Sequence, residues 1–143
     1  IEANAPVDST AIFRILDADG NATSEAGIGG STGKYISVGV VQRRIDGDLN
    51  SGIAAVNISS EANSSSIRLL NENGVEIASD LDVLDLEGGQ QKARFLDEIF
   101  PDVPAQDLDG TLVITSDKPL VVAILRTAAG LVVSSLPVGS TQR

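Results

Sequence analysis

The chain has 143 residues, enough for one domain with its own hydrophobic core, and it carries no cysteine, so disulfides and thiolate chemistry are excluded. Histidine is also absent, which removes the commonest general base and a common metal ligand. The net charge of −10 argues against nucleic acid, whose phosphates need a basic surface, and against anionic membranes. No apolar run approaches the roughly 20 residues that cross a bilayer, so we expect no membrane insertion.

The chain begins at Ile1, without an initiator methionine. We expect a removed secretory signal to be the reason, with trimming during production as the alternative, and this predicts an extracellular or cell-surface location. Residues 1–9 are typical of an extended arm, because Pro6 excludes a helix and biases Ala5 toward extended backbone. Residues 10–143 are then expected to form a single domain.

Short β-rich runs separated by turn signals fill that domain. We expect strands at 10–16, 35–42, 52–58, 67–70 and 75–86, a break near residue 83, and a loop or irregular edge strand at 22–33. Three more runs lie at 109–116, 120–126 and 131–138, split by turn signals. Residues 120–125 are apolar without a break, so both faces of that strand should be covered. The pattern predicts an all-β, antiparallel Ig-like β-sandwich of about seven to nine strands.

One segment, 90–100, has helical periodicity, and Pro101 ends it. We expect one short helix near residues 91–99 that closes an open end of the sheets. The expected core contains alternating apolar residues of the strands and the apolar stripe of this helix: Phe13, Ile15, Val38, Val56, Leu69, Phe95, Leu96, Leu112, Ile114, Val121 and Ala123.

An internal echo relates residues 13–20 to residues 67–74. The sequence FRILDADG aligns without a gap with IRLLNENG, and each copy is an apolar run followed by an acidic or amide turn and a glycine. The echo predicts two equivalent hairpins, with Gly20 and Gly74 at positive φ.

The first of these turns is also a candidate calcium site. Asp17, Asp19 and Asn21, with Glu25 beyond them, resemble part of a calcium loop. A full EF-hand loop places glycine at its sixth position and glutamate at its twelfth, whereas glycine is fourth here. An ordinary hairpin turn explains the same residues, so calcium is the weaker of the two interpretations.

No catalytic constellation emerges from the remaining polar residues, and we expect neither an enzyme nor a cofactor. A serine nucleophile would need a lysine base, and Lys34, Lys92 and Lys118 lie beside turn or helix signals where exposure is expected. Paired carboxylates are the machinery of glycosidases, but no motif fixes a distance between the loop acids, which we interpret as solvated: Asp46, Asp48, Asp80, Asp82, Asp85, Glu87, Asp107 and Asp109.

Three sequons, at Asn21, Asn57 and Asn63, are candidate glycosylation sites if the source glycosylates secreted proteins. A carbohydrate-binding module would stack sugar rings on exposed aromatic side chains. Tyr35 is the one aromatic residue besides three phenylalanines, so surface glycans are an alternative partner rather than the first.

From residue 11 onward the order of features resembles a β-sandwich module found near the C-termini of large secreted bacterial proteins. The more specific matching pieces are the segment 88–101 (GGQQKARFLDEIFP) and the strand 109–116 (DGTLVITS); the others are 11–14, 24–27, 51–57, 69–74, 125–126 and 136–138. The resemblance implies a structural or adhesive role and brings no catalytic residue. In those proteins the module ends a long chain, whereas this sequence has 143 residues.

These observations together predict a secreted structural protein that assembles with itself into a filament or surface array. The alternating residues Ile1, Ala3, Ala5 and Val7 could add as a donor strand to a neighbour's sheet edge. The run 131–138 is the other candidate donor, and a disordered arm on a monomer is the alternative reading of residues 1–9. An adhesion or carbohydrate-binding module is the second candidate function.

Overall fold

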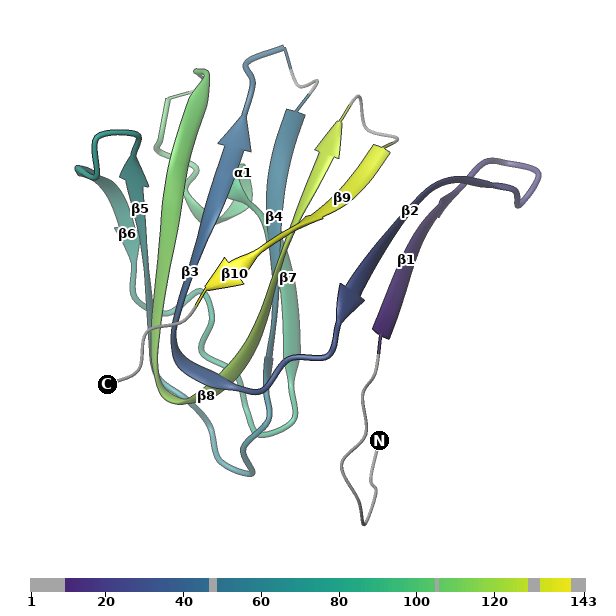
Figure 1. The fold of residues 1–143 in the computed structure, drawn as a ribbon. Coiled ribbons are helices and arrows are strands. Elements are labelled where there is room, and N and C mark those ends of the chain that lie inside the picture. The colour runs from purple at the N-terminus through teal and green to yellow at the C-terminus, as the bar shows by residue number, and fades with distance from the viewer. Residues whose placement is uncertain (1–9, 47–48, 105, 129–131, 140–143) are drawn as a thin grey trace.

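The computed structural model describes residues 10–46, 49–104, 106–128 and 132–139. They form ten strands and one short helix, which confirms the all-β class (Figure 1). The elements are β1 Thr10–Leu16, β2 Ala22–Gly29, β3 Lys34–Arg43, β4 Leu49–Asn57, β5 Ser65–Asn71, β6 Glu76–Asp80, β7 Gln91–Phe95, α1 Leu96–Ile99, β8 Leu108–Ala128, β9 Val132–Leu136 and β10 Val138–Gly139.

The long strand β8 organises the molecule. Its first half pairs antiparallel with β3 on one side and β5 on the other, and its second half pairs with β4 and β9. The halves run in opposite directions because β8 bends (Figure 1). Pairing with β5 ends at Ser116 and pairing with β4 begins at Leu120, so the bend falls where a turn was expected, at Asp117, Lys118 and Pro119. One eight-stranded sheet therefore doubles over into two layers, giving a sandwich-like fold.

The first layer contains β10, β3, the first half of β8, β5 and β6, and the second contains β9, the second half of β8, β4 and β7. Side chains from both layers meet in one core, with α1 and the segment after β6 at its margins: Val41, Ile53, Ala55, Ile67, Leu69, Leu84, Leu86, Leu96, Ile99, Phe100, Leu108, Leu112, Ile114, Leu120, Val122 and Ile124. The expected core residues Leu69, Leu96, Leu112 and Ile114 are confirmed.

Other expected core residues face outward. Val38, Val56, Val121 and Ala123 are half-buried on the outer faces of their strands. At position 39 of β3 the inward residue must be small, because a Cβ on Gly39 would lie 2.3 Å from Cδ1 of Ile124 in the opposite layer. Val38 and Val40 lie on the outward positions beside it, whereas Val41 faces the core.

Three further residues were expected in the core: Phe13, Ile15 and Phe95. Phe95 is 42% exposed, so its assignment to the core is wrong. The side chains of Phe13 and Ile15 lie outside the described residues.

The expected helix at 91–99 is shorter than predicted. Residues 91–95 form β7, which pairs antiparallel with β4 from Gly52 to Val56, and only Leu96–Ile99 are helical. Pairing satisfies the main-chain groups along one edge of β4, which a helix in the same place would leave without partners. Leu96 and Ile99 are buried at the margin of the core, as the predicted stripe required.

The two hairpins predicted by the sequence echo are both present. β1 pairs with β2, β5 pairs with β6, and Gly20 and Gly74 have φ of 85° and 76°. The β1–β2 hairpin is a separate two-stranded sheet beside β9 and stands away from the rest of the sandwich (Figure 1). The described residues thus comprise the sandwich and a projecting hairpin, and the expected arm at residues 1–9 lies outside them.

Replacing Gly74 with valine should lower the free energy of unfolding by about 1 kcal/mol or more, because a β-branched residue is strained at positive φ. A Cβ at this position would meet nothing within 4 Å, so the effect isolates the backbone conformation. Urea denaturation measures it. Gly74→Asn is the matched control and should be less destabilising, since asparagine tolerates this conformation. Equal stability of Gly74→Val and the parent protein would contradict the turn assignment.

Candidate functional site

The turn after β1 uses its acidic residue to hold the backbone. Oδ1 of Asp17 accepts hydrogen bonds from the backbone N–H groups of Asp19, at 3.0 Å, and Asn21, at 2.8 Å. The equivalent turn after β5 repeats this geometry with Oδ1 of Asn71, which accepts from Asn73 and Val75, each at 3.0 Å. A neutral amide therefore performs the same task, which identifies the carboxylate as a turn-forming group.

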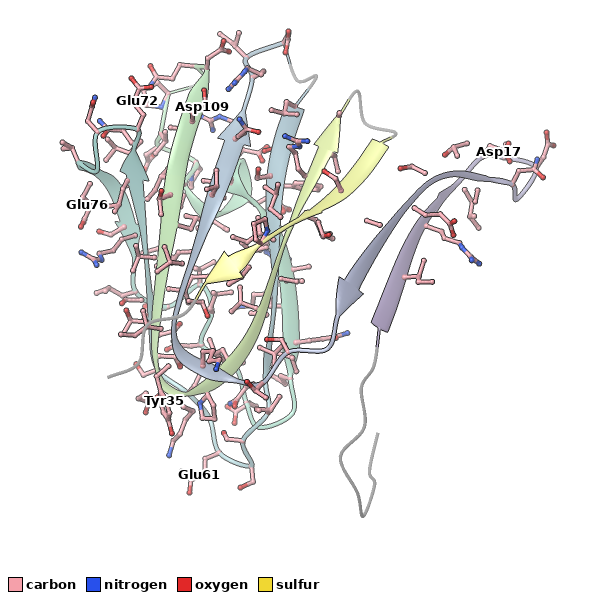
Figure 2. All side chains as sticks on the ribbon, in the orientation of Figure 1. Asp17, Tyr35, Glu61, Glu72, Glu76 and Asp109 are labelled. Atoms are coloured by element: carbon pink, nitrogen blue, oxygen red, sulfur yellow. The ribbon has the colours of Figure 1, made fainter. Side chains whose placement is uncertain are left out.

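The described residues add no further candidate calcium ligands to this turn. The pKa of Asp17 is lowered, chiefly by the hydrogen bond from the backbone of Asn21. Among the described residues, no group of three or more acidic side chains is placed to share a metal ion. Calcium binding at Asp17, Asp19 and Asn21 stays a prediction, and Figure 2 shows Asp17 near the outer end of the projecting hairpin.

Two of the three sequon asparagines are buried structural residues. Asn57 is 0% exposed, and its Nδ2 donates to the carbonyls of Glu61, at 2.7 Å, and Leu86, at 3.0 Å. Asn63 is 5% exposed; its Nδ2 donates to Leu84 O at 3.0 Å, and its Oδ1 accepts from the N–H of Leu86 at 2.9 Å. Both amides are inaccessible to glycosylation in the folded protein, whereas the third sequon asparagine, in the first turn, is exposed.

These two asparagines close one end of the sandwich. The strand expected at 75–86 ends at Asp80, and residues 81–90 continue as an irregular segment that carries buried Leu84 and Leu86 into the core. Gly88 lies against the loop at 58–64, where an added Cβ would be 2.5 Å from the carbonyl carbon of Ser60. The buried amides therefore attach an otherwise irregular segment to the layers.

The acidic residues of the loops mostly serve as hydrogen-bond acceptors for the backbone. Oδ1 of Asp80 accepts from two N–H groups of the following turn, and Oδ1 of Asp85 accepts from the N–H of Ser65 at 2.7 Å. Oδ1 of Asp107 accepts from Ile45 N–H at 3.0 Å. These hydrogen bonds stabilise the loops. Asp48 lies outside the described residues.

Two of the three lysines considered as bases are also engaged. Nζ of Lys92 donates to the carbonyl of Val83 at 2.8 Å, and Lys118 forms an ion pair with Glu61 at the bend of β8. This pairing raises the pKa of Lys118, chiefly through the hydrogen bond that its ammonium donates to Glu61. Lys118 thus stays protonated, which is the opposite of what a general base requires.

A series of polar contacts joins the end of β3 to both halves of β8. Gln42 donates from Nε2 to Asp109 at 2.7 Å and accepts at Oε1 from Arg126 at 2.8 Å. Nη2 of Arg44 lies 3.1 and 3.0 Å from the two carboxylate oxygens of Asp109. The hydrogen bonds from Gln42 and then Arg44 lower the pKa of Asp109.

The two exposed aromatic side chains that the structure describes do not form a sugar-binding platform. Tyr35 is 47% exposed near the start of β3, and Phe95 is 42% exposed and pairs with Gly52. The residue next to Gly52, Ser51, bonds through its hydroxyl to the backbone of Gln42, at the far end of β3 from Tyr35. The aromatics therefore lie at opposite ends of the sandwich and cannot flank one sugar ring.

The most unusual surface is the outer face of the projecting hairpin. Ile12 and Leu16 are 60% and 56% exposed, and Arg14 between them forms an ion pair with Glu25 of β2. Ala26, on the other face, is 6% exposed, and the hairpin lies beside β9. The hairpin thus rests on the sandwich by one face and presents apolar side chains to solvent on the other.

A second apolar surface lies on the outer face of the second layer. It consists of paired small and apolar residues from three strands, which we call the β4 face: Gly52, Ala54, Val56, Ala93, Phe95, Val121, Ala123 and Leu125. A depression of about 200 Å³, lined almost entirely by apolar atoms, lies in it around Gly52, Phe95 and Leu125. No described element covers this face, although the apolar run 120–125 predicted cover on both sides.

Among the described residues, β1, β2, β9 and β10 each have a single ladder partner, and the same is true of β6 and β7. β6 pairs only with β5, and β7 pairs only with β4. β7 carries Lys92 and Arg94, charges of the kind that blunt an edge, whereas β6 adjoins a groove of about 450 Å³ lined by Ile77, Ala78 and the residues after α1.

Comparisons with protein-family models, curated proteins and solved structures found no match. The resemblance to a module of secreted bacterial proteins therefore stays a prediction. In the described part of the chain, no helix is long and apolar enough to cross a membrane. The proposed donor residues Ile1, Ala3, Ala5 and Val7 lie outside the described residues.

Sequence reasoning missed both apolar surfaces. Ile12 and Leu16 alternate with Phe13 and Ile15, and the alternation could have shown that β1 is apolar on both faces. The β4 face had one signal, the uninterrupted run at 120–125. The residues that complete it come from strands whose partners were unknown, so their contact was not predictable.

Replacing Asn57 with alanine should lower the free energy of unfolding by about 3 kcal/mol, because the carbonyls of Glu61 and Leu86 lose the amide that donates to both. Chemical denaturation followed by circular dichroism measures the change. Asn21→Ala, at the exposed sequon, is the control and should stay within about 0.5 kcal/mol of the parent protein. Similar values for the two variants would refute the structural role of Asn57.

Asp109 should make stability depend on pH. Its pKa is lower in the folded protein than in the unfolded chain, so its stabilising contribution is present at neutral pH and is lost as pH falls through and below about 4. Asp109→Asn should therefore be less stable than the parent at pH 7, and the difference should shrink toward pH 2. Denaturant melts across this range measure it; a constant difference would show that the carboxylate's charge is not responsible.

Proposed function

We propose that this protein is a secreted, non-catalytic structural subunit that associates with other copies of itself through its N-terminal region and a β-sheet edge. The observation that carries the proposal is the projecting β1–β2 hairpin with its exposed Ile12 and Leu16. A two-stranded hairpin is marginally stable by itself, and covering its apolar face would stabilise it. A neighbouring copy supplies that cover in the proposed assembly.

Strand addition is the proposed mode of growth. The edge of β6 has main-chain groups without a ladder partner in the described residues, and the adjoining groove is lined by Ile77, Ile99 and Phe100. A donor strand with alternating apolar residues would gain main-chain hydrogen bonds along this edge and place side chains in the groove. Residues 1–9, with Ile1 and Val7 among them, have that alternation. Because donor and acceptor are different surfaces, such contacts run head to tail and produce filaments unless the ring closes.

The roles of the polar groups support a structural rather than a catalytic function. Asp80, Asp85 and Asp107 stabilise loops, and Lys118 is held protonated by Glu61. Enzyme sites instead combine a nucleophile or acid–base pair with a concave pocket. The β4 face and the hairpin are apolar surfaces of the kind that mark protein interfaces.

Ile12→Ser should weaken self-association by about tenfold or more, because an apolar side chain would no longer be buried between copies. Sedimentation velocity over a concentration series measures association, and electron microscopy shows whether filaments form. Ile45→Ser is the matched control, since Ile45 is an equally exposed isoleucine, 68% against 60%, on a loop of the sandwich. Association should strengthen as salt rises from about 0.01 to 0.15 M, because the net charge of −10 repels copies at low salt.

The outcomes separate the parts of the proposal. A protein that stays monomeric at high concentration overturns self-association altogether. Equal association of Ile12→Ser and Ile45→Ser removes the hairpin from the interface. Filaments that persist after deletion of residues 1–9 remove those residues as the donor strand and leave assembly by the hairpin in place.

A further inference from the structure

We infer that the β1–β2 hairpin is an arm that copies of the protein exchange. In the assembly it packs on β9 of a neighbouring copy, in the place that the neighbour's own hairpin occupies in this structure. The inference rests on the proposed self-association and names the contact through which it occurs.

The structure itself shows what packs on β9. The hairpin lies beside this strand, and the hydroxyl of Ser135 donates a hydrogen bond to the carbonyl of Gly27 at 3.0 Å (Figure 1). Ala26 of β2 is 6% exposed, on the face by which the hairpin rests on the sandwich. A hairpin from a second copy makes these same contacts, so exchange gives up none of the packing that the single chain has.

The hairpin can leave its own sandwich without breaking a sheet. Among the described strands, β1 and β2 pair only with each other, so no ladder hydrogen bonds join them to β9. In the described chain, residues 30–33 alone connect the hairpin to the sandwich. The first three of these residues are exposed, whereas Gly33 lies against the bend of β8, where an added Cβ would be 2.9 Å from Cβ of Pro119. The hinge of the arm is therefore residues 30–32.

The apolar character of both faces of β1 fits an arm that lies between two copies. Ile12 and Leu16 are 60% and 56% exposed on the outer face, and the alternate residues Phe13 and Ile15 are also apolar. A strand with one face in solvent normally carries polar residues on that face, whereas a strand covered on both faces is apolar throughout. An exchanged hairpin reaches from its own sandwich to the neighbour's, so its second face also gains a protein surface to contact.

The length of the hinge decides which copy the hairpin occupies. Three residues span at most about 10 Å, so the hairpin reaches its own β9 only along a restricted path. When a linker is too short to span its two sites, the effective concentration of one for the other falls toward zero. The β9 strand of a neighbouring copy is not subject to this limit.

Deleting Ser31 and Thr32 should therefore strengthen self-association by about tenfold or more, because the hinge loses about 7 Å of reach and the hairpin can no longer occupy its own β9. The matched control inserts a second Ser-Thr pair after Thr32; it keeps the contact within one chain possible and should not strengthen association. Sedimentation velocity over a concentration series measures association, and circular dichroism establishes that each variant is folded.

A pair of point variants distinguishes exchange from docking by the outer face of a hairpin that stays on its own sandwich. Ala26→Glu places a charge on the hairpin face that packs on β9, and Ser135→Arg places a long charged side chain on β9 where the hairpin meets it. Each variant alone should associate about tenfold more weakly than the parent. Their equimolar mixture should form a 1:1 complex in native mass spectrometry, because an intact hairpin of one then meets an intact β9 of the other.

The outcomes separate this inference from the proposed function. Association that is unchanged by the shortened hinge, or that is unaffected by Ala26→Glu and Ser135→Arg, overturns exchange and leaves self-association through another surface standing. Failure of the two folded point variants to form a mixed complex also overturns exchange. A protein that stays monomeric both as the parent and with the shortened hinge overturns exchange and self-association together.

Discussion

The bend of β8 at Asp117, Lys118 and Pro119 is the constraint on which the fold depends. One strand supplies main-chain hydrogen bonds to β3 and β5 before the bend and to β4 and β9 after it, so a single sheet becomes two facing layers. Proline lacks an N–H group and the chain turns where the ladder would otherwise continue. The bend is held by the loop before β5: Ser64 donates its N–H to Oδ1 of Asp117 at 2.7 Å, and the N–H of Asp117 returns a bond to Ser64 O at 3.0 Å.

Two polar residues are buried at the same end of the sandwich, and the backbone there shows why. Asn57 and Asn63 lie where two irregular segments, 58–64 and 81–90, cross the opening between the layers. Irregular backbone cannot satisfy its own carbonyl and N–H groups, so buried side-chain amides take the place of a ladder. Leu84 and Leu86 can then enter the core from a segment that is neither helix nor strand. The hydrogen bonds of the two asparagine side chains thus allow Leu84 and Leu86 to be buried.

The apolar surface of this acidic protein is distributed unevenly. The inner faces of both layers are closed over one core, whereas the β4 face and the hairpin face are left to solvent by the described residues. A net charge of −10 keeps separate copies apart and favours solubility, while the two apolar faces favour specific contact. In the assembly proposed above, the balance between these terms would make association depend on protein and salt concentration.

The sequence by itself determined the strand content, the two equivalent turns and the location of the bend. These features follow from local chemistry: a glycine at positive φ, an Asp17 or Asn71 side chain that accepts backbone N–H groups, and a charged, proline-containing turn signal between two apolar runs. Tertiary structure alone decided that Gly39 and not Val38 faces inward, that residues 91–95 pair as a strand instead of extending the helix, and that Asn57 is buried. It also decided where the β1–β2 hairpin lies. Each of these depends on pairing or packing with residues distant in sequence, and an alternating pattern with apolar residues on both faces fits either orientation until the facing layer is known.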